Sequence, residues 1–137
     1  TTEPFSEKIL TSFIAEQKRD IFEVKQKRYV ISSQKISTLG FIDLFDFEPL
    51  HRRAGVGILI IEKFRGKGFG KKALDLLISY SKKNLNMNCL FANIAFENLA
   101  SINLFKSSGF IKVGLKKSWN FYHNSFHDEY LYQKLLS

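Results

Sequence analysis

The stretch VGILIIEKFRGKGFGKKALDLLISY, Val56–Tyr80, joins an apolar run, a turn with three glycines and an amphipathic pattern. The apolar run is typical of a buried strand, and the apolar residues that follow Gly70 recur at helical spacing. Glycines at 66, 68 and 70 permit a sharp turn and let backbone amides approach a ligand closely. Together with the N-terminus of the following helix, they predict a site for phosphate or pyrophosphate.

Three phosphate-binding motifs can be tested against this turn. The nucleotide-triphosphate motif G-x-x-x-x-G-K-[ST] needs a longer turn, and Lys72 stands where its Ser or Thr should be. The dinucleotide motif G-x-G-x-x-G needs a wider glycine spacing and an acid at the end of the next strand, and the sequence has neither. The pattern R-x-x-G-x-G fits at every position, with Arg65, Gly68 and Gly70.

A second stretch, ENLASINLFKSSGF at Glu97–Phe110, agrees with that third motif. With it, the chain resembles the GNAT (Gcn5-related) acetyltransferases, in which R/Q-x-x-G-x-G/A holds the pyrophosphate of acetyl-coenzyme A. The stretch resembles the family's downstream block N-x-x-[AS]-x-x-x-[YF]-x-x-x-G-F. LHRRAGVGILI and the closing GLKKSW and DEYLYQKLL segments are most similar to the branch of ribosomal-protein N-terminal and spermidine acetyltransferases.

The resemblance implies the GNAT fold, an α/β (α+β) architecture with a mixed, mostly antiparallel central sheet flanked by helices. We expect one domain, residues 1–137, that lacks the family's usual first strand and helix. Periodicity and turn residues predict helices that begin near Ser6, Gly70 and Asn98. The predicted strands are Arg28–Ser32, Lys35–Glu48, Arg53–Ile61, Cys89–Phe96, Phe110–Trp119 and Asp128–Leu136. We expect the first two to form a hairpin through Ser33 and Gln34, and a loop, Asn120–His127, to join the last two.

Composition limits the function classes. The chain has 21 basic and 13 acidic residues, which gives a net charge of +8 and suits a polyanionic small molecule as well as a nucleic acid. No nucleic-acid-binding motif accompanies the charge, so such a role is disfavoured. No apolar run approaches the roughly 20 residues of a membrane span, and we expect no membrane association. The single cysteine, Cys89, suits a core position in a reducing compartment, and we expect a cytoplasmic protein.

The resemblance also implies which residues hold the cosubstrate acetyl-CoA. The strand residues would pair through their backbone with the pantetheine arm, the turn would hold the pyrophosphate, and Asn98 would hydrogen-bond the cofactor. The implied cofactor-binding residues are Ile58, Leu59, Ile60, Arg65, Gly66, Lys67, Gly68, Phe69, Gly70, Lys71, Asn98 and Phe105. Gly55 and Gly57 would either permit a bulge that opens the strand for the thioester or only ease close packing. No His or Cys cluster has metal-ligand spacing, and no metal is expected.

Catalytic groups are less well defined by the sequence. Asp46, Glu48 and His51 are candidates for the base, or the end of a water relay, that removes a proton from an attacking amine. A solvated loop is the alternative interpretation for all three. Many relatives carry Tyr where this chain has Phe105, and phenylalanine cannot protonate the leaving thiolate. The general acid therefore has no candidate.

These observations favour an acetyl-CoA-dependent N-acetyltransferase in which a primary amine attacks the thioester directly. Its partners would be acetyl-CoA and an acceptor amine on a small molecule or a protein N-terminus, and a homo-oligomer is compatible with them. A catalytically silent acyl-CoA-binding or regulatory domain is the alternative. Trp119, Tyr122, His123 and His127 either line the acceptor pocket or cover one end of the sheet.

Overall fold

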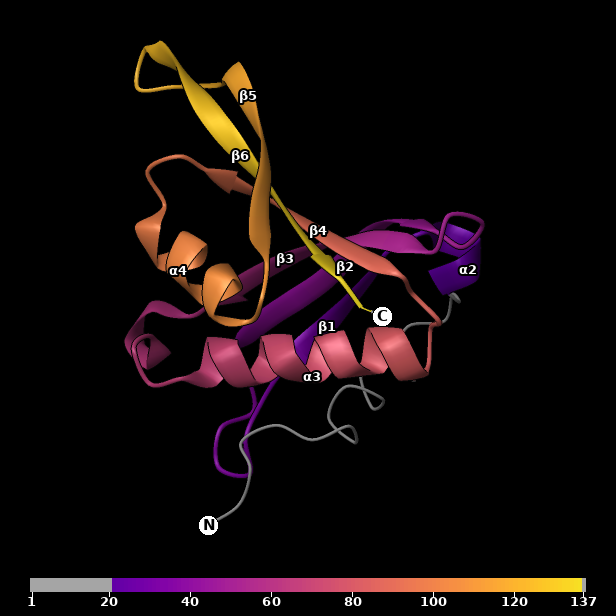
Figure 1. Ribbon diagram of the computed structural model, residues 1–137. Helices are drawn as coiled ribbons and strands as arrows, with labels where there is room; N and C mark the ends of the chain where they lie inside the picture. Colours follow the sequence, from indigo (N-terminus) through magenta and orange to yellow (C-terminus); the bar gives the residue numbers. More distant parts are fainter. Residues whose placement is uncertain (1–20, 137) are drawn as a thin grey trace.

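The computed structural model describes residues 21–136, which form a six-stranded sheet with helices against it (Figure 1). The elements in chain order are α2 (Ile21–Val24), β1 (Lys27–Ile31), β2 (Gly40–Glu48), β3 (Arg53–Ile60), the 3₁₀ turn η1 (Glu62–Phe64), α3 (Phe69–Lys83), β4 (Cys89–Ala95), α4 (Leu99–Ser107), β5 (Ile111–Tyr122) and β6 (Ser125–Leu135). The helix predicted to begin at Ser6 lies outside the described residues. The predicted fold class is confirmed: the sheet is mixed, mostly antiparallel and flanked by helices.

The strand order is β1-β2-β3-β4-β6-β5. Four of the neighbouring pairs are antiparallel, and only β3 and β4 run parallel. A parallel pair needs a crossover connection, and α3 supplies it. The parallel pairing is short, because only Arg53–Gly55 of β3 pair with Cys89–Phe91 of β4. The two central strands, β3 and β4, are therefore hydrogen-bonded only near their N-terminal ends.

One hydrophobic core holds α3 and α4 against the sheet. Leu74 and Leu77 of α3 and Ile102 of α4 are buried in the same cluster as Leu44 of β2 and Leu90 of β4. Figure 1 shows both helices on one side of the sheet, while the far end of the β5–β6 hairpin extends beyond the rest of the molecule. Side chains alternate along a strand, so the residues between these buried positions lie on the opposite face.

Two connections differ from the prediction. The first hairpin is not closed through Ser33 and Gln34, because β2 begins at Gly40 and pairs there with Ile31. The residues between form a loop in which the Ile36 N–H is 3.1 Å from the Ser33 hydroxyl and the Ser33 N–H is 2.9 Å from the Ile36 carbonyl. This local turn satisfies backbone groups that a strand would have used.

The predicted loop Asn120–His127 is wrong as well. β5 and β6 continue through it, and only His123 and Asn124 connect them, both with positive φ. Such a two-residue turn matches the twist of a hairpin. The strands stay paired towards the tip because Phe121 and Phe126 face each other with their ring centroids 4.9 Å apart.

No helix in residues 21–136 is long and apolar enough to cross a membrane.

Candidate functional site

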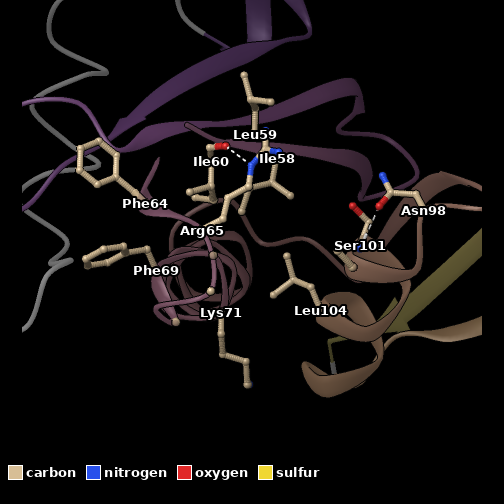
Figure 2. A pocket seen from close by; sticks show the side chains of 14 residues that line it. Ile58, Leu59, Ile60, Phe64, Arg65, Phe69, Lys71, Asn98, Ser101 and Leu104 are labelled. Atoms are coloured by element: carbon tan, nitrogen blue, oxygen red, sulfur yellow. Dashed lines mark hydrogen bonds between the residues drawn. The ribbon is translucent and has the colours of Figure 1, made fainter. Parts of the chain in front are cut away.

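A pocket of about 380 Å³ lies where β3 ends, between the first turns of α3 and α4 (Figure 2). It joins segments that are far apart in the chain, since Ile58 and Leu104, 46 positions apart, both line it. The lining residues are Ile58, Leu59, Ile60, Phe64, Arg65, Gly66, Gly68, Phe69, Gly70, Lys71, Asn98, Ala100, Ser101 and Leu104. Ten of the twelve predicted cofactor-binding residues are among them.

The glycine turn needs glycine for its backbone conformation. Gly66 and Gly68 have φ of +76° and +86°, and apart from its own chain neighbours no residue would lie within 4 Å of a Cβ built on either one. Gly68 precedes α3, and no side chain caps the helix there. The partial positive charge of the helix N-terminus therefore faces an uncapped, open turn, which is the arrangement that binds phosphate groups.

The two basic side chains of the pocket are held in place by protein groups. Arg65 Nε donates to the carbonyl oxygen of Ile60 at 2.7 Å, shown as the dashed line beside Arg65 in Figure 2. Lys71 Nζ lies 2.8 Å from an oxygen of Asp75 and 3.3 Å from the hydroxyl of Ser108, which in turn donates to the other oxygen of Asp75. The contact of Arg65 with a neutral carbonyl leaves its positive charge at the rim of the pocket, whereas the charge of Lys71 is paired with Asp75. The contacts of Lys71 and Ser108 tie α3 to the end of α4.

One edge of β3 is open beside this pocket. Pairing between β3 and β4 stops at Gly55 and Phe91, and among residues 21–136 no strand pairs with that edge of β3 further on. We call the place where the two strands part the β3–β4 opening; Val56–Ile60 and Ala92–Ala95 border it. An extended arm can hydrogen-bond to such an edge as an added strand.

The glycines of β3 do not form the bulge that was one of the two options for them. The irregularity lies in β2, between Phe45 and Glu48, where Asp46 has φ of +48°. Gly55 instead makes room for the ring of Phe45, which overlaps the place that a Cβ would take. The ring of Phe45 also packs edge-on against Phe91, with the centroids 5.7 Å apart. Close packing therefore accounts for Gly55.

The remaining predicted residues divide into three groups. Asn98 lines the pocket and also caps α4, because its Oδ1 accepts from the N–H of Ser101 at 3.2 Å. Lys67 is exposed on the turn and does not line the pocket. Phe105 does not line it either, since its side chain is 3% exposed in the core and packs edge-on against Phe110. Direct contact of Phe105 with a ligand in this pocket is not expected from its place in the core.

The three candidate bases lie away from the pocket. Asp46 and Glu48 are exposed near the end of β2, and His51 is exposed in the turn that follows. Glu48 pairs with Arg53 at the start of β3, whereas the pocket begins at Ile58. At about 3.3 Å per residue, the two ends of β3 are separated by roughly 20 Å.

Sequence reasoning missed four lining residues, Phe64, Ala100, Ser101 and Leu104. Helical phase could have indicated the last two, since Ser101 and Leu104 follow Asn98 at intervals of three on one face of α4.

Residues 21–136 contain no group of three or more His, Cys, Asp or Glu that could hold a metal ion. Cys89 is buried, as predicted.

Comparison with known proteins agrees with this geometry. The model of the acetyltransferase (GNAT) domain family matches residues 2–111. Similar proteins include a spermidine N(1)-acetyltransferase from Vibrio cholerae, 26% identical over 70% of this chain and 56% of that protein, and a putative ribosomal N-acetyltransferase from Bacillus subtilis, 30% identical over 73% and 54%. A dodecameric structure of spermidine N-acetyltransferase from Vibrio cholerae aligns with a TM-score of 0.80 at 25% identity, over 85% of this chain and 68% of that one.

The site thus combines an uncapped helix behind an R-x-x-G-x-G turn with a strand edge that its parallel neighbour leaves open. Since the family model matches most of the chain, this protein belongs to the GNAT acetyltransferase family. The chain spans about half the length of the spermidine and ribosomal acetyltransferases that it matches in sequence.

Proposed function

We propose that the chain is an acetyl-CoA-dependent N-acetyltransferase domain that transfers an acetyl group to a primary amine. The observation that carries the proposal is the pocket, in which the glycine turn, the N-terminus of α3 and the open edge of β3 meet. We propose that residues 1–137 all belong to this one domain.

The residues present fit acetyl-CoA as a substrate. Backbone groups of Ile58 would pair with the pantetheine arm along the open edge, where the carbonyl of Ile60 is already used by Arg65. The backbone groups of Leu59, the residue between them, point to the other edge of the strand, towards β2. The turn from Gly66 to Gly70 would take the pyrophosphate, with Arg65 supplying charge and Lys71 at the rim of the pocket, where it is paired with Asp75. The bound arm would direct the thioester into the β3–β4 opening.

The proposed transfer is direct. The nitrogen of the neutral amine attacks the thioester carbonyl, the new C–N bond forms, and the C–S bond breaks with departure of the thiolate. One proton leaves the amine, and the thiolate takes one from water, because Phe105 has none to give. A thiol pKa of about 8.5 makes the thiolate a tolerable leaving group. Asp46, Glu48 and His51 remain proposed ends of a water relay that accepts the proton of the amine.

One observation favours a second candidate, a catalytically silent acyl-CoA-binding or regulatory domain. The side chain where many relatives carry a tyrosine is a phenylalanine that is buried in the core. A domain of this kind would bind acetyl-CoA as tightly as an enzyme and release no thiol. Binding and turnover therefore have to be measured separately.

The proposal extends to acceptor, assembly and location. We propose an amine of a polyamine or of a protein N-terminus as acceptor; the relatives named for spermidine and for the ribosome support an amine acceptor. The dodecameric relative supports a homo-oligomer. A single buried cysteine is compatible with a reducing, cytoplasmic compartment.

Isothermal titration of the chain with acetyl-CoA tests the binding site, with Gly68→Asn and Gly68→Asp as a matched pair. Asn and Asp both tolerate the left-handed conformation of Gly68 and have the same size, so the pair differs in charge alone. Two unit charges about 6 Å apart repel by roughly 0.7 kcal/mol in water and about 3 kcal/mol at an effective dielectric constant near 20. We expect Gly68→Asp to bind acetyl-CoA about tenfold or more weakly than Gly68→Asn. Equal affinities would place the pyrophosphate elsewhere.

Turnover is then followed as thiol released from acetyl-CoA in the presence of spermidine, a peptide with a free N-terminus, or no amine. Amine-dependent thiol release supports the enzyme. Tight binding with no thiol release above the amine-free rate for any acceptor would support the silent domain instead. Absence of acetyl-CoA binding would contradict both candidates.

A further inference from the structure

A lysine ammonium is bound by other side chains on the sheet face that α3 and α4 leave open. Lys116 Nζ lies 2.7 Å from the Oδ1 of Asn93 and 3.5 Å from the Oε1 of Glu129. It also lies 5.1 Å from the ring centroid of Trp119. An amide oxygen, a carboxylate and an aromatic face are the three kinds of group that recognise an organic ammonium ion.

Sheet register places this group beside the β3–β4 opening. Asn93 is two residues beyond Phe91, where the pairing of β4 with β3 ends. Its neighbours Ala92 and Ile94 are buried in the core that holds the helices, so the exposed Asn93 lies on the opposite face. Glu129 pairs with Ala95, one strand further from the opening. Lys116 therefore reaches across β6 to the strand that borders the opening.

The groups around the ammonium are positioned by their own contacts. The second oxygen of Glu129 accepts from the Nδ2 of Asn120 at 2.9 Å, and the side chain of Glu129 is 16% exposed. The register of β5 shifts between Lys116 and Asn120, which places Trp119 next to the lysine. The carboxylate would therefore remain in place without Lys116.

We propose that Asn93, Glu129 and Trp119 form the subsite for the ammonium or amine group of the acceptor, and that Lys116 fills this subsite until an acceptor displaces it. The pocket lies on the helix side of the sheet, so an acceptor reaches a thioester in the opening from the face that carries Lys116. The proposal rests on the proposed function for the identity of the ligand as the acceptor. Lys116 thus competes with the acceptor. An acceptor has to bind Asn93, Glu129 and Trp119 more tightly than Lys116 does before it can occupy the subsite.

The subsite contains its own reporter, because Trp119 is the single tryptophan of the chain. The experiment titrates n-butylammonium into the chain and follows Trp119 fluorescence, with 1-butanol as the uncharged probe. Lys116→Met removes the competing ammonium and keeps a long side chain. Lys117→Met removes the same charge from the exposed neighbouring residue and is the control.

We expect a saturable response to n-butylammonium, with a dissociation constant about fivefold lower in Lys116→Met than in the wild type and in Lys117→Met. Adding Glu129→Gln to Lys116→Met should weaken binding about tenfold, because a hydrogen bond to a charged group is lost. A linear response in Lys116→Met, an equal response to 1-butanol, or equal constants in Lys116→Met and the wild type would each overturn the proposal.

Titration with acetyl-CoA of the same protein separates this proposal from the function on which it rests. A saturable ammonium site in a chain that does not bind acetyl-CoA would contradict the proposed function and leave the subsite standing. Acetyl-CoA binding without an ammonium response would contradict the subsite alone. With an acceptor that is turned over, Lys116→Met should lower KM about fivefold and leave kcat nearly unchanged.

Discussion

Gly55 and Gly57 lie two residues apart on the same face of β3, yet the structure predicts opposite effects when each is replaced by alanine. A Cβ on Gly55 would overlap three carbon atoms of the Phe45 ring. A Cβ on Gly57 would have one ring atom of Phe45 at 4.0 Å, an ordinary contact. Gly55→Ala therefore has to displace an aromatic ring, whereas Gly57→Ala does not.

The size of the effect follows from what the ring would lose. Displacing Phe45 breaks its edge-on contact with Phe91, worth about 1 kcal/mol, and overpacking typically costs about 1–3 kcal/mol. We expect Gly55→Ala to lower the free energy of unfolding by about 2 kcal/mol. Gly57→Ala should leave it unchanged or raise it by up to about 1 kcal/mol, because glycine is unfavourable inside a strand.

Urea denaturation of both variants measures these free energies. A double-mutant cycle with Phe45→Leu tests the cause, since the smaller side chain relieves the overlap. Gly55→Ala should cost much less in the Phe45→Leu background, with a coupling of about 1 kcal/mol or more. If Gly55→Ala and Gly57→Ala have the same stability, or the coupling is zero, the ring of Phe45 does not explain Gly55.

Three further predictions concern single residues. Gly70→Ala should raise the free energy of unfolding by about 0.5–1 kcal/mol in urea denaturation, because alanine favours a helix and its Cβ would have the nearest atom, of Leu104, at 3.4 Å. Asn98→Ala should lower it by about 1 kcal/mol by the same assay, through loss of the cap on the Ser101 N–H. Burial raises the pKa of the Tyr29 hydroxyl, so its proton is released more readily from the unfolded chain. The wild type should therefore lose stability as the pH rises above about 10, the ordinary value, and Tyr29→Phe should flatten that loss in urea midpoints measured against pH.

Segments with strong local signals were predictable. The cap at Asn98 and the glycine at 109, with φ of +93°, bracket α4 in the sequence and in the structure. The start of β2 was not predictable. Ser33 and Ile36 hydrogen-bond to each other in a local turn, and the chain does not pair in the sheet again until Gly40. The hairpin tip was also missed, since His-Asn is a less common turn pair than Asn-Gly and polar residues around it resemble a loop.

The site was predictable only where its residues are close in sequence. The turn from Arg65 to Lys71 carries its own motif, and most of its residues line the pocket. Which residues of α4 line the pocket depends on which face of the helix meets α3. A motif that fixes only residue spacing does not specify that face. Phe105 shows the consequence: it shares the buried face with Ile102, whereas Leu104 is the neighbour that reaches the pocket.

Two carboxylates flank the β3–β4 opening on the open face, and their partners differ in how easily they can be displaced. Asp43, which pairs with Gly57, is bound by Arg28 through two parallel contacts of 2.9 and 3.0 Å. A bidentate ion pair between a guanidinium and a carboxylate is strong and rigid. Glu129 is met by the single ammonium of Lys116 at 3.5 Å, on a flexible side chain. An incoming ammonium ion can replace a lysine by exchanging like for like, whereas at Asp43 it would have to break both contacts of an arginine. From the asymmetry of these two pairs we infer that acceptor recognition lies on the Glu129 side of the opening.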